Sequence, residues 1–92
     1  MEHEMNLDEL IKRLSDLKVG EWLTISAEDP EGRRETLDFY KMQFLADTII
    51  LYNTPNCDVG ILQDTAFCSW EDLVEDLFNY YTNDLECIIL IQ

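Results

Sequence analysis

The sequence predicts a single small α+β domain, with a mainly antiparallel sheet of four or five strands and two helices packed on one face of it. Its 92 residues are enough for one domain with one hydrophobic core. Two segments repeat apolar residues at helical spacing, and the other segments have the alternating or continuous apolar patterns of strands. The predicted order is helix, three strands, a short fourth strand, helix and a final strand. We expect residues 1–5 to be a flexible tail and residues 6–92 to be the domain.

The first helix is predicted to begin after Asn6. Asparagine caps helices well, and Glu9 follows three positions later in the arrangement of a capping box. Cations toward the far end of this segment suit the helix dipole, and Gly20 is a suitable residue to stop the helix. The apolar residues have the spacing of one buried helix face: Leu7, Leu10, Ile11, Leu14 and Leu17.

A β-hairpin is predicted to follow this helix. Apolar side chains alternate with others along Glu21–Ala27, which indicates a strand with one covered face. Residues 28–32 predict a turn, because Pro30 presets its own φ and Gly32 accepts a positive φ. The second strand then runs from Arg34 to Leu45.

In the second strand the apolar positions change parity near Tyr40. This change indicates either a β-bulge at that point or a sheet that is partly covered on both faces. A tight turn at Asp47 leads into Thr48–Tyr52, whose continuous apolar run is typical of a central strand. Residues 54–56 end this strand, and Val59–Leu62 form the short fourth strand.

The second helix is predicted to begin after Ser69, which can cap it, with Asp72 at the third helical position. Asn83 and Asp84 end this helix, and Leu85–Ile91 form the final strand, with apolar residues on both faces. The buried stripe of the helix has regular spacing: Trp70, Leu73, Val74, Leu77, Phe78 and Tyr81.

Charge is the most unusual property of the chain. Twenty Asp and Glu residues stand against six Lys and Arg residues, which gives a formal net charge of −14. Residues 42–92 contain nine acids and no Lys or Arg, a net charge of −9. Such a surface attracts basic proteins and repels nucleic acid and anionic membranes. All basic residues come early: Lys12, Arg13, Lys18, Arg33, Arg34 and Lys41.

No pattern of catalytic residues is apparent. The single histidine, His3, falls in the expected tail, and the chain has no Gly-rich phosphate loop, nucleophile elbow or zinc-binding set. Asp58 and Asp64 lack the spacing of a calcium loop. We therefore expect no enzyme activity, cofactor or metal. The cysteines are expected to be free thiols in a reducing cytoplasm: Cys57, Cys68 and Cys87.

The second helix carries the candidate functional residues. Its acids form two rows of i, i+4 pairs, repeating at about 6 Å along the helix axis. Rows of this kind can pair with lysines and arginines that normally hold phosphates, although many acidic helix faces are only solvated. Asparagine and tyrosine side chains extend the same end of the helix, and exposed tyrosines anchor interfaces. The predicted partner-binding surface consists of Glu71, Asp72, Glu75, Asp76, Asn79, Tyr80 and Asp84.

In size, charge and pattern the chain resembles phage-encoded DNA-mimic inhibitors of the anti-CRISPR type. The segment Asn6–Lys12, followed by a short antiparallel sheet and an acidic helical region, is similar in style to some members of that group. The resemblance implies that the acidic surface occupies the groove of a CRISPR-associated nuclease that receives target DNA. It also implies binding that weakens with added salt.

Residues Ser69–Gln92 resemble a second group, the barstar-type nuclease inhibitors, through an acidic helix with interleaved aromatics and a terminal Ile88–Ile91 strand. Both resemblances imply one mechanism, in which carboxylates take the place of phosphates. The expected partner is a basic nucleic-acid-binding protein, either a Cas effector or another nuclease, with no direct binding of nucleic acid or membrane.

Two alternatives remain open at this level. The protein could be an immunity or antitoxin protein that neutralises a cognate nuclease. It could also be a non-inhibitory adaptor domain that binds through an exposed apolar patch around Trp22 or Tyr80. A homodimer is feasible if Leu85–Ile91 or Glu21–Ala27 is an exposed sheet edge.

Overall fold

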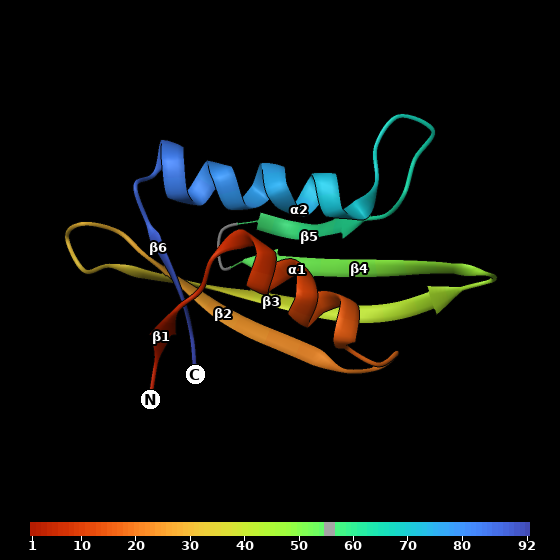
Figure 1. Ribbon diagram of the computed structural model, residues 1–92, viewed down its shortest axis with the longest axis horizontal. Coiled ribbons are helices and arrows are strands. Elements are labelled where there is room, and N and C mark those ends of the chain that lie inside the picture. The colour runs from red at the N-terminus through yellow and green to blue at the C-terminus, as the bar shows by residue number, and fades with distance from the viewer. Residues whose placement is uncertain (55–56) are drawn as a thin grey trace.

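In a computed structural model, which describes residues 1–54 and 57–92, six antiparallel strands form one sheet with both helices on the same side (Figure 1). This confirms the α+β class, although the sheet has one strand more than expected. The strand order is β1-β6-β2-β3-β4-β5. Pro55 and Asn56, in the expected turn, lie outside the described residues. The elements are β1 (His3–Glu4), α1 (Leu7–Asp16), β2 (Trp22–Glu28), β3 (Arg34–Phe44), β4 (Asp47–Thr54), β5 (Cys57–Leu62), α2 (Trp70–Asn79), the π-helical turn η1 (Tyr80–Asp84) and β6 (Ile88–Ile91).

Helix α1 begins as predicted but does not complete the capping box. Asn6 Oδ1 accepts a hydrogen bond from the backbone N–H of Glu9 at 2.8 Å. The Glu9 carboxylate instead contacts Arg13 Nε at 3.2 Å and His3 Nε2 at 2.9 Å. Leu10 and Leu14 are buried against the sheet, as the spacing indicated.

Helix α2 also begins where expected, but the helical chain continues beyond the predicted end. Val74 and Tyr81 are buried and the rest of the predicted stripe packs against the core. Residues 83 and 84, expected to stop the helix, belong to η1. The chain leaves the helical segment at Glu86, whose φ of 56° lies in the left-handed region. Strand β6 is therefore shorter than the predicted final strand.

The parity change in β3 is not caused by a β-bulge. Strand β3 pairs in continuous register with β2 and with β4. Leu37 and Phe39 face the helices and are fully buried, whereas Tyr40 and Met42 face the other side of the sheet. A bulge is therefore excluded, and β3 has apolar side chains on both faces, of which only one is covered by the described helices.

Lys41 occupies a core-facing position in β3 and is only 8% exposed. Its Nζ donates hydrogen bonds to the carbonyl oxygens of Ser15 at 2.9 Å and Leu17 at 2.8 Å. The last carbonyls of a helix have no partner within the helix and lie at the negative end of its dipole. Lys41, on strand β3, thus caps the C-terminus of α1.

The N-terminal segment belongs to the folded domain. Residues 1–5 were expected to be a flexible tail, but β1 pairs with β6, and Met5 is 2% exposed within the core. Strand β6 lies between β1 and β2, and β2 lies between β6 and β3. The prediction of an exposed edge is therefore wrong for β6, which has a strand on each side. Strand β2 pairs with β6 only through Ser26–Glu28, so that, among the described strands, Trp22–Ile25 have a neighbour on one side only.

Candidate partner-binding surfaces

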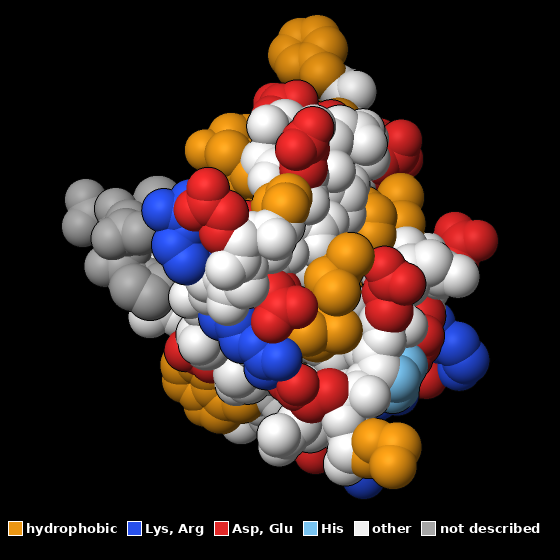
Figure 2. Space-filling view, turned by 90° about the vertical axis from the view of Figure 1, so that its left-hand side faces the viewer, with side chains coloured by type: hydrophobic (Ala, Val, Ile, Leu, Met, Phe, Trp, Pro, Cys, Tyr) orange, Lys and Arg blue, Asp and Glu red, His pale blue; other side chains and the backbone are white. Residues whose placement is uncertain are grey.

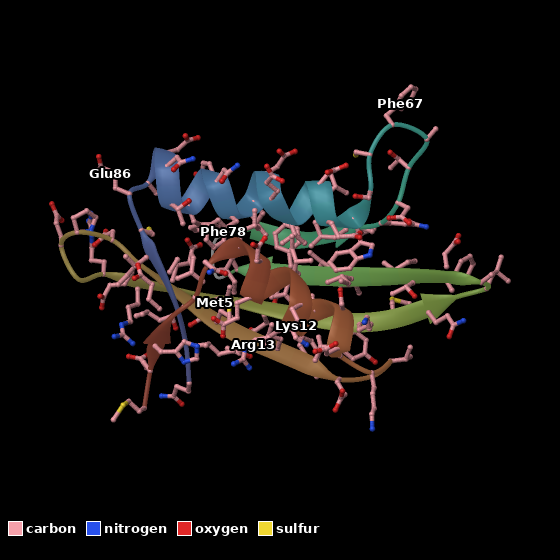
Figure 3. The ribbon with its side chains drawn as sticks, in the orientation of Figure 1. Met5, Lys12, Arg13, Phe67, Phe78 and Glu86 are labelled. Carbon is pink, nitrogen blue, oxygen red and sulfur yellow. The ribbon has the colours of Figure 1, made fainter. Side chains whose placement is uncertain are left out.

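The seven predicted site residues lie together along α2 and η1. Their helix buries Val74 and Tyr81 toward the sheet, so that the acidic residues lie on the opposite, outward side (Figures 1 and 3). We call these residues the acidic face. Five of them are exposed and two, Glu71 and Asn79, are half-buried. The exposed members are Asp72, Glu75, Asp76, Tyr80 and Asp84.

Asp72 also has a structural function. Its backbone N–H donates to Ser69 Oγ at 3.2 Å, and its carboxylate accepts from the Ser69 N–H at 3.1 Å. This is a complete capping box at the start of α2, where negative charge is also favoured by the helix dipole. Glu75 and Asp76, one turn further on, are therefore the clearer candidates for binding a partner.

Basic side chains are engaged elsewhere in the molecule. Lys41 is buried under α1, and Arg34 pairs with Glu2 at 2.5 Å and Glu28 at 2.9 Å. The hydrogen bond from Arg34 holds the pKa of the Glu2 carboxyl below its usual range. Within residues 1–54 and 57–92, every ion pair joins partners from the first 34 positions. The acidic face consequently has no intramolecular cation beside it, and the red side chains near the top of Figure 2 have no blue ones among them.

The end of the acidic face has an unusual backbone. Tyr80 begins η1 and is 49% exposed, as expected, with its ring in an edge contact with Tyr81 at 5.3 Å. Single π-helical turns occur often at functional sites. Glu86 follows, exposed and pointing away from the domain (Figure 3), and adds a carboxylate that the sequence did not single out.

A second surface lies on the side of the sheet that no described helix covers. Four residues in direct register form an apolar row across β2, β3, β4 and β5. The ring centroids of Trp22 and Tyr40, the first two residues of the row, are 4.7 Å apart. Phe44 and Val59 extend the apolar surface. We call this surface the open face. Its row consists of Trp22, Tyr40, Leu51 and Ile61.

The open face is strongly exposed for an apolar surface. Trp22, Phe44, Val59 and Ile61 are each 61% exposed. Of the residues on the open face, only Trp22 was named from the sequence as a candidate for an apolar patch. The signal for the rest was the parity change at Tyr40, which indicated an apolar second face without giving its neighbours on β4 and β5.

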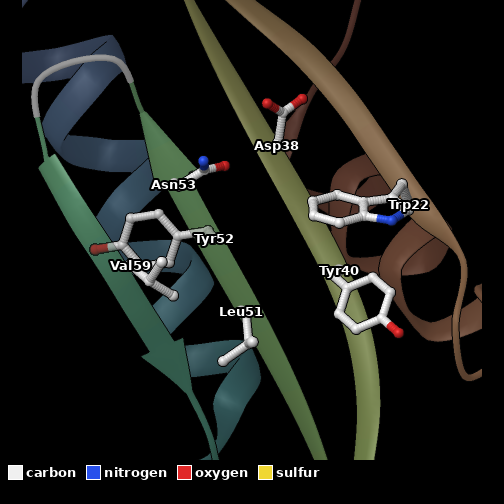
Figure 4. Close-up of a pocket in the computed structure, with 7 residues that line it drawn as sticks. All are labelled: Trp22, Asp38, Tyr40, Leu51, Tyr52, Asn53 and Val59. Carbon is white, nitrogen blue, oxygen red and sulfur yellow. The ribbon is translucent and has the colours of Figure 1, made fainter.

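A shallow hollow lies in this face between the Trp22–Tyr40 pair and Val59 (Figure 4). Its volume is about 90 Å³, and its polar side chains are Asp38 and Asn53. Pockets that bury drug-sized ligands measure roughly 300–1,000 Å³. The hollow is large enough for a side chain of another protein and too small for a substrate of that size.

His3 contacts Glu9 on the surface, and no group of three or more His, Cys, Asp or Glu among residues 1–54 and 57–92 is placed to hold a metal ion. Cys87 is buried, which raises the pKa of its thiol, and Cys68 is half-buried. The side chains of Cys57 and Asp58 lie outside the described part.

Neither described helix has the length and apolar character needed to cross a membrane. Comparisons of the chain with protein-family models, with curated proteins and with solved structures gave no match.

Proposed function

We propose that the protein is an inhibitor that uses its acidic face to mimic nucleic-acid phosphates and blocks the basic site of a CRISPR-associated or restriction nuclease. The observation that carries this proposal is that, among the described residues, no ion pair joins the acidic face to a lysine or arginine. In an ordinary soluble helix, lysines and arginines would neutralise such carboxylates within the same surface. Here the charges are available to a partner.

The geometry suits a cationic groove. Successive carboxylates on one side of α2 repeat at about 6 Å along the axis, because four residues rise 1.5 Å each. Arginine and lysine side chains that normally hold phosphates can form charge-assisted hydrogen bonds to carboxylates. Tyr80, at the end of the row, offers a ring that can bury apolar area in the same contact.

An immunity protein that neutralises a cognate nuclease toxin would use the same face and the same chemistry. The two functions differ in the genes that surround this one: a toxin gene would be adjacent in the second case. A binding domain that acts without inhibition is favoured by a different observation, the exposed Trp22 of the open face.

The test is a cleavage assay with a purified CRISPR nuclease and its guide, and with a restriction nuclease, in the presence of increasing amounts of the protein. We expect inhibition of at least one enzyme that weakens as salt is added. Glu75→Lys/Asp76→Lys should abolish it, because the reversed charges repel the cationic groove.

The matched control is Glu4→Lys/Glu31→Lys, which changes the net charge equally at exposed sites away from α2. This variant should inhibit like the wild type. An equal loss of inhibition in both variants would show that total charge, and not the acidic face, is responsible. Undiminished inhibition by the Glu75 and Asp76 variant, with α2 intact by circular dichroism, would exclude the acidic face as the binding surface.

A further inference from the structure

The open face exposes about as much apolar surface as the largest patches found on monomeric domains. Large side chains have areas of roughly 150–250 Å², so the open face presents on the order of 600 Å² of apolar surface. The largest patch of a typical monomer measures roughly 300–600 Å² and is often functional. The nearby turn adds Leu45, which is 84% exposed and has a φ of 56°, where glycine is preferred.

We propose that a second copy of this chain covers the open face, so that the two sheets pack against each other in a two-fold symmetric dimer. The dimer would have four layers, with helices outside and the two sheets between them. This interface is distinct from pairing of sheet edges, and it goes beyond the inhibitory function proposed above.

The exposed area of the open face is close to what one copy contributes to a stable dimer interface. A stable interface takes roughly 800 Å² from each partner, of which the centre is apolar and the rim polar. The open face as a whole supplies most of that area, and Thr24 and Asp38, which are joined by a 2.6 Å hydrogen bond, lie beside its row. In a two-fold symmetric dimer the same surface of each copy contacts the other, so it must carry both the projecting groups and the recess that receives them. The open face has both, the rings of Trp22 and Tyr40 and the shallow hollow beside them.

The distribution of charge also favours a second copy. A chain of net charge −14 can approach its own copy only through a surface that carries little of that charge. On the open face Asp38 lies beside the row, Asp47 is opposite Phe44 at the hairpin end, Glu4 lies on the edge strand, and Glu2 and Glu28 are paired with Arg34.

The acidic faces would stay far apart in this dimer. Packed sheets lie roughly 10 Å apart, and each α2 lies on the far side of its own sheet. The separation therefore exceeds the Debye length of about 8 Å at physiological salt, so that repulsion between the two helices is screened. A basic partner, in contrast, would be attracted to α2 and not to this face.

The test is the molar mass of the full chain by light scattering over a wide concentration range. We expect twice 10.8 kDa for the wild type and 10.8 kDa for Trp22→Thr/Ile61→Lys at the same concentrations. The dissociation constant should rise by about 100-fold or more, because both copies lose the two most exposed side chains of the row. Circular dichroism checks that the variant is folded.

The matched control is Phe67→Lys, which alters an apolar residue that is 97% exposed on the loop beyond β5, pointing away from the sheet (Figure 3). It should remain a dimer, as should the Glu75→Lys/Asp76→Lys variant. A wild type that stays monomeric at all concentrations overturns the proposal. A dimer that persists in the Trp22→Thr/Ile61→Lys variant also overturns the proposal. The same holds if the open face binds a different protein while the chain itself stays monomeric.

Loss of the dimer and loss of inhibition are separable results. The Trp22 and Ile61 variant keeps all acidic side chains of α2 and should still inhibit a nuclease as a monomer. The Glu75 and Asp76 variant should remain dimeric and fail to inhibit. Either proposal can therefore fail while the other holds.

Discussion

Replacement of Lys41 by methionine tests how the C-terminus of α1 is held. Methionine keeps the unbranched apolar stem and removes the ammonium group, so the carbonyls of Ser15 and Leu17 lose donors at 2.9 and 2.8 Å. These hydrogen bonds are part-buried, and leaving a fully buried acceptor unsatisfied costs about 1–3 kcal/mol, which sets the upper bound here. The variant also avoids the desolvation of a buried charge, which offsets part of this loss. We therefore expect the free energy of unfolding to fall by about 1–3 kcal/mol.

Urea denaturation followed by circular dichroism measures this change. In a domain of this size, each kcal/mol corresponds to roughly 4–8 °C in the melting temperature. The control is Lys12→Met, the same substitution on the exposed side of α1, where Lys12 forms only a surface ion pair with Asp16. That change should cost less than about 0.5 kcal/mol. Equal stability of the two variants would refute the assignment of Lys41 as the partner of the helix end.

Three further substitutions test other parts of the fold. Gly60→Ala should destabilise the protein by about 1–3 kcal/mol in a urea titration, since a Cβ there meets the Tyr52 ring, and by less in a Tyr52→Leu background; an equal loss in both would contradict this. Glu86→Gly should stabilise it by about 1 kcal/mol in thermal melts, because φ is 56° there; a lower melting temperature would argue against it. Arg34 lowers the pKa of Glu2 in the folded state, so its contribution is present above the usual pKa of Glu and is lost as the pH falls through the folded value. The stability difference between wild type and Arg34→Gln should therefore shrink from pH 7 to pH 3, and a constant difference would exclude the ion pair as its source.

Helix positions were predictable because local signals determine them. Caps at Asn6 and Ser69 and the apolar periodicity of each segment act over a few residues, and the structure has both helices where these signals fall. The position of the acidic row follows from the same periodicity, since the buried stripe of α2 determines which side faces outward. The strands of the hairpins were predictable for a similar reason, because alternation and turn residues are also local.

Features that depend on distant partners were not predictable. Strand β1 has two residues and no pattern of its own, and it forms only because β6 is beside it. Lys41 was counted only as one of the six basic residues, because its acceptors lie some 25 positions away on α1. The continuation of α2 into η1 also differs from the local signal, since Asn83 and Asp84 are normally poor helix formers.

The place of β6 has a consequence for biosynthesis. It is the last strand of this chain, yet it lies between β1 and β2, the first two. During translation the sheet cannot be completed until residues 88–91 have left the ribosome, and until then β1 has no strand to pair with. Loss of β6 would take Ile89 and Ile91 from the core and leave Ser26–Glu28 of β2 without a strand on one side.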